Sequence, residues 1–361
     1  MTEARPLRVL LVANDGFSTG HVVRATAIAR GLARAAERRG IALARVLATT
    51  SEAHALVGRE ALAIVTLPAP VAARRAGLSD AERRQLVRTA LGGVIDGFGP
   101  DLIAVDTFPS GPHGELAGVK TDRHTRRALI RRSVPDATAD ALTAGLGDYD
   151  LAILAGDPEP LIVELPIAVR HVPPITSIEA SCLADRATAR RLLGLPDGRL
   201  ILVAAGGGGD LVGMERARVI AEAVVRVAPE LTPVLAVGPL ARDWSPRPEP
   251  KIRTLRTAAL ASLLAAFDGA FAPAGYNTAH ELAKARVPAA LSAQPRPFDD
   301  QAARAARFEK AGFARALTTT SDDAVAEAIA WMATARIPEL EAGGADRAAE
   351  ALLDLVTGGR R

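Results

Sequence analysis

A histidine follows a glycine shortly after the first apolar run of the chain. Residues 14–24, NDGFSTGHVVR, come directly after LRVLLVA, a run that predicts a buried β-strand. Ligands of parallel α/β sheets bind where strands end, and a loop with Gly16, Thr19 and Gly20 lets main-chain amides approach a substrate. His21 falls in the first turn of the next helix, where the positive helix end favours a neutral imidazole that can accept a proton. A turn-capping role is the alternative.

Two carboxylates accompany this histidine in the first half of the chain. Asp106 ends the predicted strand DLIAVD, and Glu115 lies in the segment PSGPHGEL that follows. Asp106 can orient the imidazole or act as the base itself, and Glu115 is a third candidate in the same region. The sequence is equally compatible with a turn-capping role for Asp106.

A glycine-rich turn follows a predicted strand in the second half, in the segment AAGGGGDLVG. Its glycines Gly206, Gly207 and Gly208 suit a dinucleotide site, a phosphate site or a tight turn. The spacing departs from a dinucleotide fingerprint, and a P-loop would need a Gly-Lys-Ser/Thr that this segment lacks. In all three interpretations the glycines lie at the carboxyl end of a predicted strand.

A second helix start combines glycine with polar residues, in the stretch Gly275, Tyr276, Asn277 and Thr278. Main-chain N–H groups at such a helix start suit a diphosphate. Glu281 lies one turn inside the helix, where a carboxylate can accept two hydrogen bonds from a ribose diol.

The next helix opens with acceptors suited to sugar hydroxyls, in the order Asp299, Asp300 and Gln301. Ordinary helix N-caps are the alternative for the two aspartates.

Elements that must position these residues alternate along the chain, with short β-rich runs between helical runs. This alternation predicts an α/β protein with two doubly wound, Rossmann-like domains that face each other across a cleft. The proline-rich residues 162–177 place the boundary near residue 175. We therefore expect an acceptor-binding domain over residues 1–175 and a donor-binding domain over residues 176–361, with a C-terminal helix that can cross back to the first domain.

Composition narrows the class of protein. The 361 residues are 49% apolar and 24% charged, with a net charge of +3. A single cysteine, Cys182, excludes an internal disulfide and a cysteine-based zinc site. Basic runs interleaved with aromatics are missing, which argues against nucleic-acid binding. The short apolar runs favour a cytoplasmic protein.

The arginine-rich residues 68–100 leave three interpretations open: an acceptor lid, a peripheral contact with an anionic membrane surface, or a solvated helix face. The arginines concerned are Arg74, Arg75, Arg83, Arg84 and Arg88.

The chain resembles GT-B glycosyltransferases in the strand, glycine-bearing loop, histidine and helix near its start. The segments DTFPSGPHGEL, AAGGGGD, GYNTAHEL and PRPFDDQAARA share this resemblance. The resemblance is closest to the family of the bacterial lipid II N-acetylglucosaminyltransferase, a glycosyltransferase family 28-like group. It implies that the C-terminal domain binds the nucleotide, with Glu281 on the ribose and the preceding helix start on the diphosphate. Asp300 and Gln301 would face the donor sugar.

The resulting prediction is an inverting hexosyltransferase that uses a nucleotide sugar, with UDP as the expected nucleotide. It needs no cofactor and no metal, because Asp-X-Asp is missing at the strand ends and helix ends can offset the charge of the leaving diphosphate.

Other functions on the same fold stay open. Residues 20–24, Gly-His-Val-Val-Arg, match the Gly-His-X-X-Arg of UDP-sugar hydrolases of pseudaminic acid synthesis. A non-hydrolysing epimerase and a non-catalytic nucleotide-sugar-binding protein are further alternatives. The acceptor and the oligomeric state are not determined by the sequence.

Overall fold

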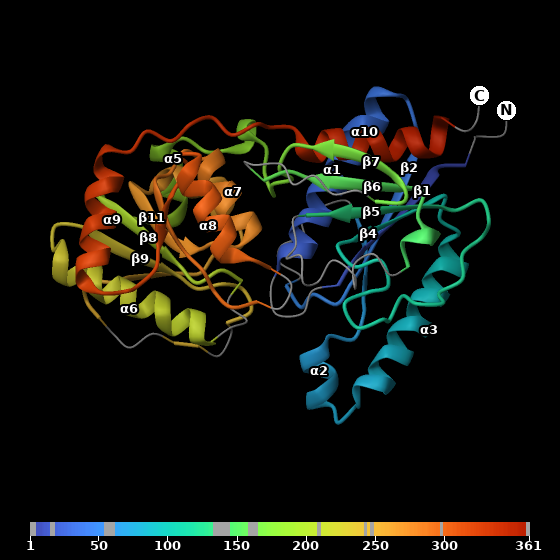
Figure 1. Cartoon of the computed structure of the whole chain (residues 1–361), viewed down its shortest axis with the longest axis horizontal. Coiled ribbons are helices and arrows are strands. Elements are labelled where there is room, and N and C mark those ends of the chain that lie inside the picture. Colours follow the sequence, from blue (N-terminus) through green and yellow to red (C-terminus); the bar gives the residue numbers. More distant parts are fainter. Residues whose placement is uncertain are drawn as a thin grey trace. The chain divides into compact units, whose positions relative to one another are not determined.

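The computed structural model of the chain describes residues 5–14, 19–53, 62–132, 145–157, 165–207, 211–241, 244–245, 249–296 and 299–358. The chain divides into two compact units (Figure 1). The first comprises Met1–Ile175 with Gly343–Arg361, and the second comprises Thr176–Ala342.

A parallel seven-stranded sheet forms the centre of the first unit, in the order β3-β2-β1-β4-β5-β6-β7. The elements in chain order are β1 (Leu7–Ala13), α1 (Gly20–Arg38), β2 (Leu43–Thr49), β3 (Ala63–Thr66), α2 (Pro70–Arg75), α3 (Asp80–Phe98), β4 (Leu102–Asp106), β5 (Arg126–Arg131), β6 (Leu151–Ala155), β7 (Ala168–Val172) and α10 (Gly344–Thr357). The strand order reverses between β1 and β4, so ligands are expected at the carboxyl ends of these two strands.

Apolar strands and amphipathic helices explain how this unit is built. The central strands are buried along their length, and α3 packs Val87, Leu91 and Ile95 onto one face of the sheet, where they join Val105 and Leu129 in a single apolar cluster. The C-terminal helix α10 packs beside α1, as Figure 1 shows.

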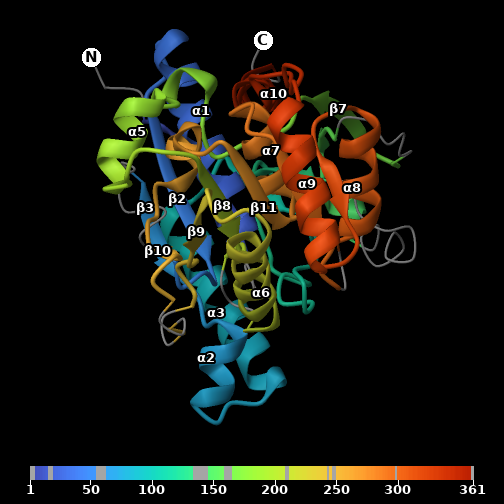
Figure 2. The same ribbon diagram turned by 90° about the vertical axis from the view of Figure 1, so that its left-hand side faces the viewer.

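The second unit has a parallel sheet of six strands, in the order β10-β9-β8-β11-β12-β13. Its elements are α5 (Arg186–Leu193), β8 (Leu200–Ala204), α6 (Leu211–Val227), β9 (Thr232–Ala236), β10 (Arg253–Leu255), β11 (Gly269–Pro273), α7 (Tyr276–Lys284), β12 (Ala289–Ser292), α8 (Gln301–Lys310), β13 (Arg315–Leu317) and α9 (Asp322–Thr334). Helix α6 packs against β8, β9 and β11 (Figure 2). The order reverses between β8 and β11.

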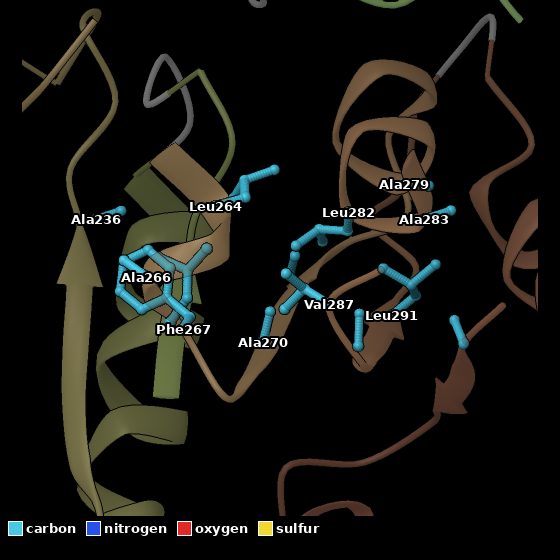
Figure 3. Packing of buried hydrophobic residues seen from close by; sticks show 14 of the residues in the cluster. Ala236, Leu264, Ala266, Phe267, Ala270, Ala279, Leu282, Ala283, Val287 and Leu291 are labelled. Carbon is cyan, nitrogen blue, oxygen red and sulfur yellow. The ribbon is translucent and has the colours of Figure 1, made fainter. Parts of the chain in front are cut away.

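Packing of α7 fixes the place of its N-terminus. Leu282 and Ala283 on α7 join Ala270 of β11 and Leu291 of β12 in one apolar cluster (Figure 3). Because this face is held against the sheet, the helix begins at the carboxyl end of β11, three residues after Pro273.

The fold differs from the sequence-based expectations in several places. The proline-rich residues 162–177 contain an edge strand, β7, that no periodicity indicated. A 3₁₀ helix, Leu260–Ala266, precedes β11. Arg83 does not belong to a solvated face, because it continues the buried stripe of α3 at a spacing of four residues and is 1% exposed.

Candidate functional site

The carboxyl ends of β1 and β4 bring His21 and Asp106 together in the first unit. Asp106 is the last residue of β4, and His21 is the second residue of α1, which follows β1. Nδ1 of His21 lies 2.6 Å from the Oδ2 atom of Asp106. An ionised carboxylate can only accept, so in the neutral form of the imidazole Nδ1 carries the proton and Nε2 carries the lone pair. The ring of Phe108 lies beside the imidazole, with the ring centroids 5.8 Å apart.

Arg24 binds the same carboxylate from the next turn of α1. Its Nε atom donates to Oδ1 of Asp106 and its Nη2 atom donates to Oδ2, each at 2.7 Å. Burial raises the pKa of the Asp106 carboxyl, but the charge of Arg24, followed by His21, outweighs this and lowers the pKa to about 2. Asp106 is therefore ionised at neutral pH and can stabilise a positive charge on the imidazole.

A strained turn follows Asp106. Thr107 has a φ of 66°, which is costly for a β-branched residue. The N–H group of Phe108 donates to the carbonyl of Asp106 at 2.9 Å, which closes a three-residue turn around Thr107. Nη2 of Arg24 also donates to the Thr107 hydroxyl at 3.0 Å. These two hydrogen bonds hold the turn at Thr107, and with it the positions of Asp106 and Phe108.

Glu115 belongs to a different buried network. Its Oε1 accepts from the side chain of Asn14 at 3.1 Å, and its Oε2 accepts from the N–H group of His113 at 2.7 Å. Arg83 is its cationic neighbour, with Nη1 at 4.0 Å from Oε1. The side chain is fully buried. These contacts make Glu115 a support for the loop after β4, whereas His21 is oriented by Asp106.

Of the loop residues expected on the acceptor side, Gly16 lies outside the described residues. Thr19 is the N-cap position of α1, and Gly20 is its first residue. Both therefore lie next to His21 at the carboxyl end of β1.

In the second unit, the glycine turn after β8 lies where the strand order reverses. Gly206 has a φ of 79°, a conformation that favours glycine. Gly208 lies outside the described residues. A Cβ atom on Gly238 would lie 2.4 Å from the carbonyl oxygen of Gly206, so the turn can pass this close only because residue 238 is glycine. Gly207 is held by its carbonyl, which accepts from the N–H group of Leu240 at 3.0 Å.

The start of α7 has no side-chain cap. Its N-cap is Gly275, which has no side chain, and Tyr276, Asn277 and Thr278 form a first turn without acidic residues. The ring of Tyr276 is buried against His280, with the ring centroids 4.2 Å apart. The ring of Tyr276 thus packs into its own unit, and a helix start of this kind suits an anion.

Glu281 and Lys284, one turn apart on α7, both contact the segment that opens the second unit. The hydroxyl of Ser177 donates to Oε1 of Glu281. Nζ of Lys284 donates to the hydroxyl of Thr176 at 2.7 Å and lies 3.6 Å from the carboxylate of Glu179. The carboxylate expected to bind a ribose diol therefore accepts a hydrogen bond from a hydroxyl of its own unit.

The acidic residues before α8 have separate roles. Asp300 is the N-cap of α8 and accepts from the N–H group of Ala303 at 2.9 Å. The Oδ1 atom of Asp299 accepts from Nη1 of Arg304 at 2.8 Å. The capping alternative therefore holds for Asp300.

A buried glutamine and a buried arginine connect the two helix starts. Nε2 of Gln301 donates to Asp299 at 3.2 Å, and its Oε1 accepts from the main chain of Gln294 at 3.1 Å. Arg304 donates to the carbonyl of Ala274, next to the N-cap of α7, at 3.0 Å. Sequence reasoning missed Arg304, although its spacing of three residues from Gln301 is a helical signal.

The described residues contain no group of three or more histidines, cysteines, aspartates and glutamates placed to hold a metal ion. Within the same residues, no helix is both long and apolar enough to cross a bilayer.

No protein-family model and no curated protein matches the chain. Solved structures do. A UDP-glucosyltransferase from Polygonum tinctorium that glucosylates indoxyl has a TM-score of 0.64 and 15% identity, over 99% of this chain and 95% of that one. The spinosyn rhamnosyltransferase SpnG, complexed with thymidine diphosphate, has a TM-score of 0.58 and 16% identity, over 98% and 96%.

A third similar structure is a putative UDP-N-acetylglucosamine 2-epimerase from Listeria monocytogenes, with a TM-score of 0.64 and 13% identity over 99% of this chain and 97% of that one. Identities this low establish the fold alone. The chain has the two-domain α/β GT-B fold on which nucleotide-sugar glycosyltransferases and epimerases are built.

Proposed function

We propose that the protein is a glycosyltransferase that moves a sugar from a nucleoside-diphosphate donor to an acceptor hydroxyl. The observation that carries this proposal is the arrangement of His21, Asp106 and Arg24 at the reversal point of the first sheet. It supplies a base with a defined tautomer, an ionised carboxylate that orients it, and a buried cation that holds the carboxylate.

In the proposed reaction, Nε2 of His21 accepts the proton of the acceptor hydroxyl, and that oxygen attacks the anomeric carbon of the donor. The bond from this carbon to the diphosphate oxygen breaks, which inverts the configuration. Asp106 stabilises the imidazolium that forms, as in other acid–base pairs of this kind. The second unit supplies N–H groups at the start of α7, from Gly275 onward, for the negative charge of the leaving diphosphate.

The identity of the donor and the family of the enzyme are parts of this proposal. The names of similar structures include a UDP-glucosyltransferase and a rhamnosyltransferase complexed with thymidine diphosphate, so UDP and TDP sugars are the donors to test first. Likeness to the lipid II N-acetylglucosaminyltransferase family stays part of the proposal, as does metal independence. Activity is expected to survive excess EDTA, and complete loss that Mg²⁺ restores would contradict the metal-independent reaction.

Hydrolysis or epimerisation of the donor is the second candidate. The Gly-His-X-X-Arg motif at residues 20–24 and the epimerase among the similar structures favour it. In hydrolysis water replaces the acceptor, and in epimerisation a proton leaves one carbon of the sugar and returns to its opposite face.

Incubation with UDP and TDP sugars, with and without a panel of hydroxyl acceptors, separates these functions. A transferase releases nucleoside diphosphate only when an acceptor is present and forms a glycoside. Free sugar or an epimer without any acceptor would instead identify a hydrolase or an epimerase. His124→Gln is a matched control for His21→Gln, because His124 is an exposed histidine of the same unit. Equal turnover in the two variants would remove His21 from the mechanism.

A further inference from the structure

Arg131, the last residue of β5, is a buried arginine that has no counter-ion among the described residues. It is 3% exposed, and its Nη1 atom is buried without a hydrogen-bond partner. The described part of the chain offers its guanidinium no hydrogen bond and no ion pair. Burial lowers the pKa of this group, because loss of water disfavours its charged form.

Other buried arginines of the chain have a carboxylate nearby. Arg24 makes two hydrogen bonds to Asp106, and Arg304 donates to Asp299. Arg83 lies 4.0 Å from Glu115. A buried charge without such a partner is strongly destabilising, and none of the described residues supplies one for Arg131, whereas an anionic ligand can.

The place of Arg131 indicates where that partner binds. The N–H group of Thr107, the residue after Asp106, donates to the carbonyl of Ile130 at 2.7 Å, so Arg131 ends its strand beside the strained turn. The carboxyl ends of β4 and β5 thus bring Arg131 to the same edge of the sheet as the His21–Asp106 pair. Ligands of doubly wound sheets bind at this edge.

Further polar atoms on the same face of the sheet lack partners. Leu129, two residues before Arg131, packs with the buried stripe of α3, and side chains alternate along a strand. Arg131 therefore leaves β5 on the α3 face. Arg83 of α3 has Nε and Nη1 atoms without hydrogen bonds among the described residues, and Oδ1 of Asn14, after β1, has none either. The α3 face of the sheet thus carries several buried polar atoms that make no hydrogen bond to the described residues.

We propose that Arg131 is the subsite for a carboxylate or phosphate group of the acceptor. The planar guanidinium can donate two parallel hydrogen bonds to either group. It is held at the carboxyl edge of the sheet that also carries the candidate base, on the α3 face, whereas Asp106 follows Val105 and faces α1. The inference rests on the proposed function, and it names the acceptor class as a hydroxyl compound that also carries an anionic group.

Anion binding tests the subsite without any transfer reaction. Calorimetric titration with inorganic phosphate and with acetate compares wild type, Arg131→Gln, Arg131→Lys and Arg126→Gln. Arg126 is the matched control, because it is an exposed arginine at the other end of β5, paired with Asp150. We expect at least one anion to bind wild type and Arg126→Gln about 10- to 100-fold more tightly than Arg131→Gln, with Arg131→Lys between them.

Thermal unfolding of the ligand-free variants excludes a purely structural role. Removal of an unpaired buried charge should leave Arg131→Gln at least as stable as wild type. Anion affinities that are equal in wild type and Arg131→Gln would overturn the subsite. So would a lower melting temperature in Arg131→Gln, because it would mean that the guanidinium stabilises the fold.

Matched acceptors connect the subsite to the reaction. The KM values of 4-hydroxybenzoate, 4-hydroxyphenyl phosphate and uncharged 4-hydroxybenzamide are compared in wild type and Arg131→Gln. A tenfold or larger rise, about the effect of losing one charge-assisted hydrogen bond, is expected only for the charged acceptors, and the one most affected identifies the anion. Equal changes for all three would refute the acceptor role. Arg131-dependent anion binding without transfer to any acceptor would refute the proposed function and leave the anion site standing.

Discussion

Replacing Asp106 with asparagine would break the buried Arg24–Asp106 pair and keep the shape of the side chain. The pair has two hydrogen bonds of 2.7 Å, and the two side chains are 2% and 4% exposed. Arg24 would then remain buried with its positive charge uncompensated, which costs about 3–5 kcal/mol in comparable buried pairs. Nδ1 of His21 would lose its carboxylate acceptor in the same step.

The effect should depend on pH in a defined direction. The pKa of Asp106 falls from an ordinary 3.8 to about 2 in the folded protein, because Arg24 and His21 outweigh the effect of burial. A depressed folded-state pKa contributes stability that is complete above about pH 4 and is lost as the pH falls toward 2. The difference corresponds to roughly 2–3 kcal/mol. Since asparagine does not titrate, the stability gap between wild type and Asp106→Asn should narrow by this amount between pH 5 and 2.

Urea unfolding with two probes can measure this change. Both tryptophans, Trp244 and Trp331, belong to the second unit, whereas far-ultraviolet circular dichroism reports both units. We expect Asp106→Asn to shift the dichroism transition of the first unit and to leave the tryptophan transition in place.

The double variant Arg24→Met/Asp106→Asn completes a mutant cycle and should recover part of the loss, since it removes the uncompensated charge. A loss below about 1 kcal/mol at pH 7, or a gap that stays constant from pH 5 to 2, would refute the buried ion pair as a source of stability.

Three further predictions follow from the same contacts. His21→Gln should lower kcat by about 10²–10⁴ with little change in nucleotide affinity, measured by steady-state kinetics and calorimetry, and near-normal turnover would place the base elsewhere. Glu281→Gln should weaken UDP or TDP binding by roughly 1.5–3 kcal/mol if the carboxylate binds ribose, whereas an equal loss in Ser177→Ala would assign the effect to their mutual hydrogen bond. Gly238→Ala should displace the turn at Gly206, because the new Cβ atom would lie 2.4 Å from the carbonyl oxygen of Gly206. We expect a lower melting temperature and a lower nucleotide affinity, and an unchanged melting temperature would contradict the close approach.

Much of the fold could be predicted from local patterns. Apolar runs such as LRVLLVA and LIAVD are strands because buried parallel strands need continuous apolar side chains. Glycine and polar residues at the start of α7 predict the position of that helix in the same local way. Edge strands β7, β10 and β13 are short and mixed in character, so their pairing depends on neighbours in the sheet.

The sequence by itself determined the α/β class, the alternation of strands and helices, and the candidates His21 and Asp106, because each depends on residues near one another in the chain. Only the tertiary structure brought together Asp106 and Arg24, which are 82 positions apart, and buried Arg131 where no described carboxylate pairs with it. The charge state and the partners of a polar side chain depend on what packs around it. Those neighbours come from strands and helices that are distant in the sequence, so the local periodicity and spacing of residues do not predict them.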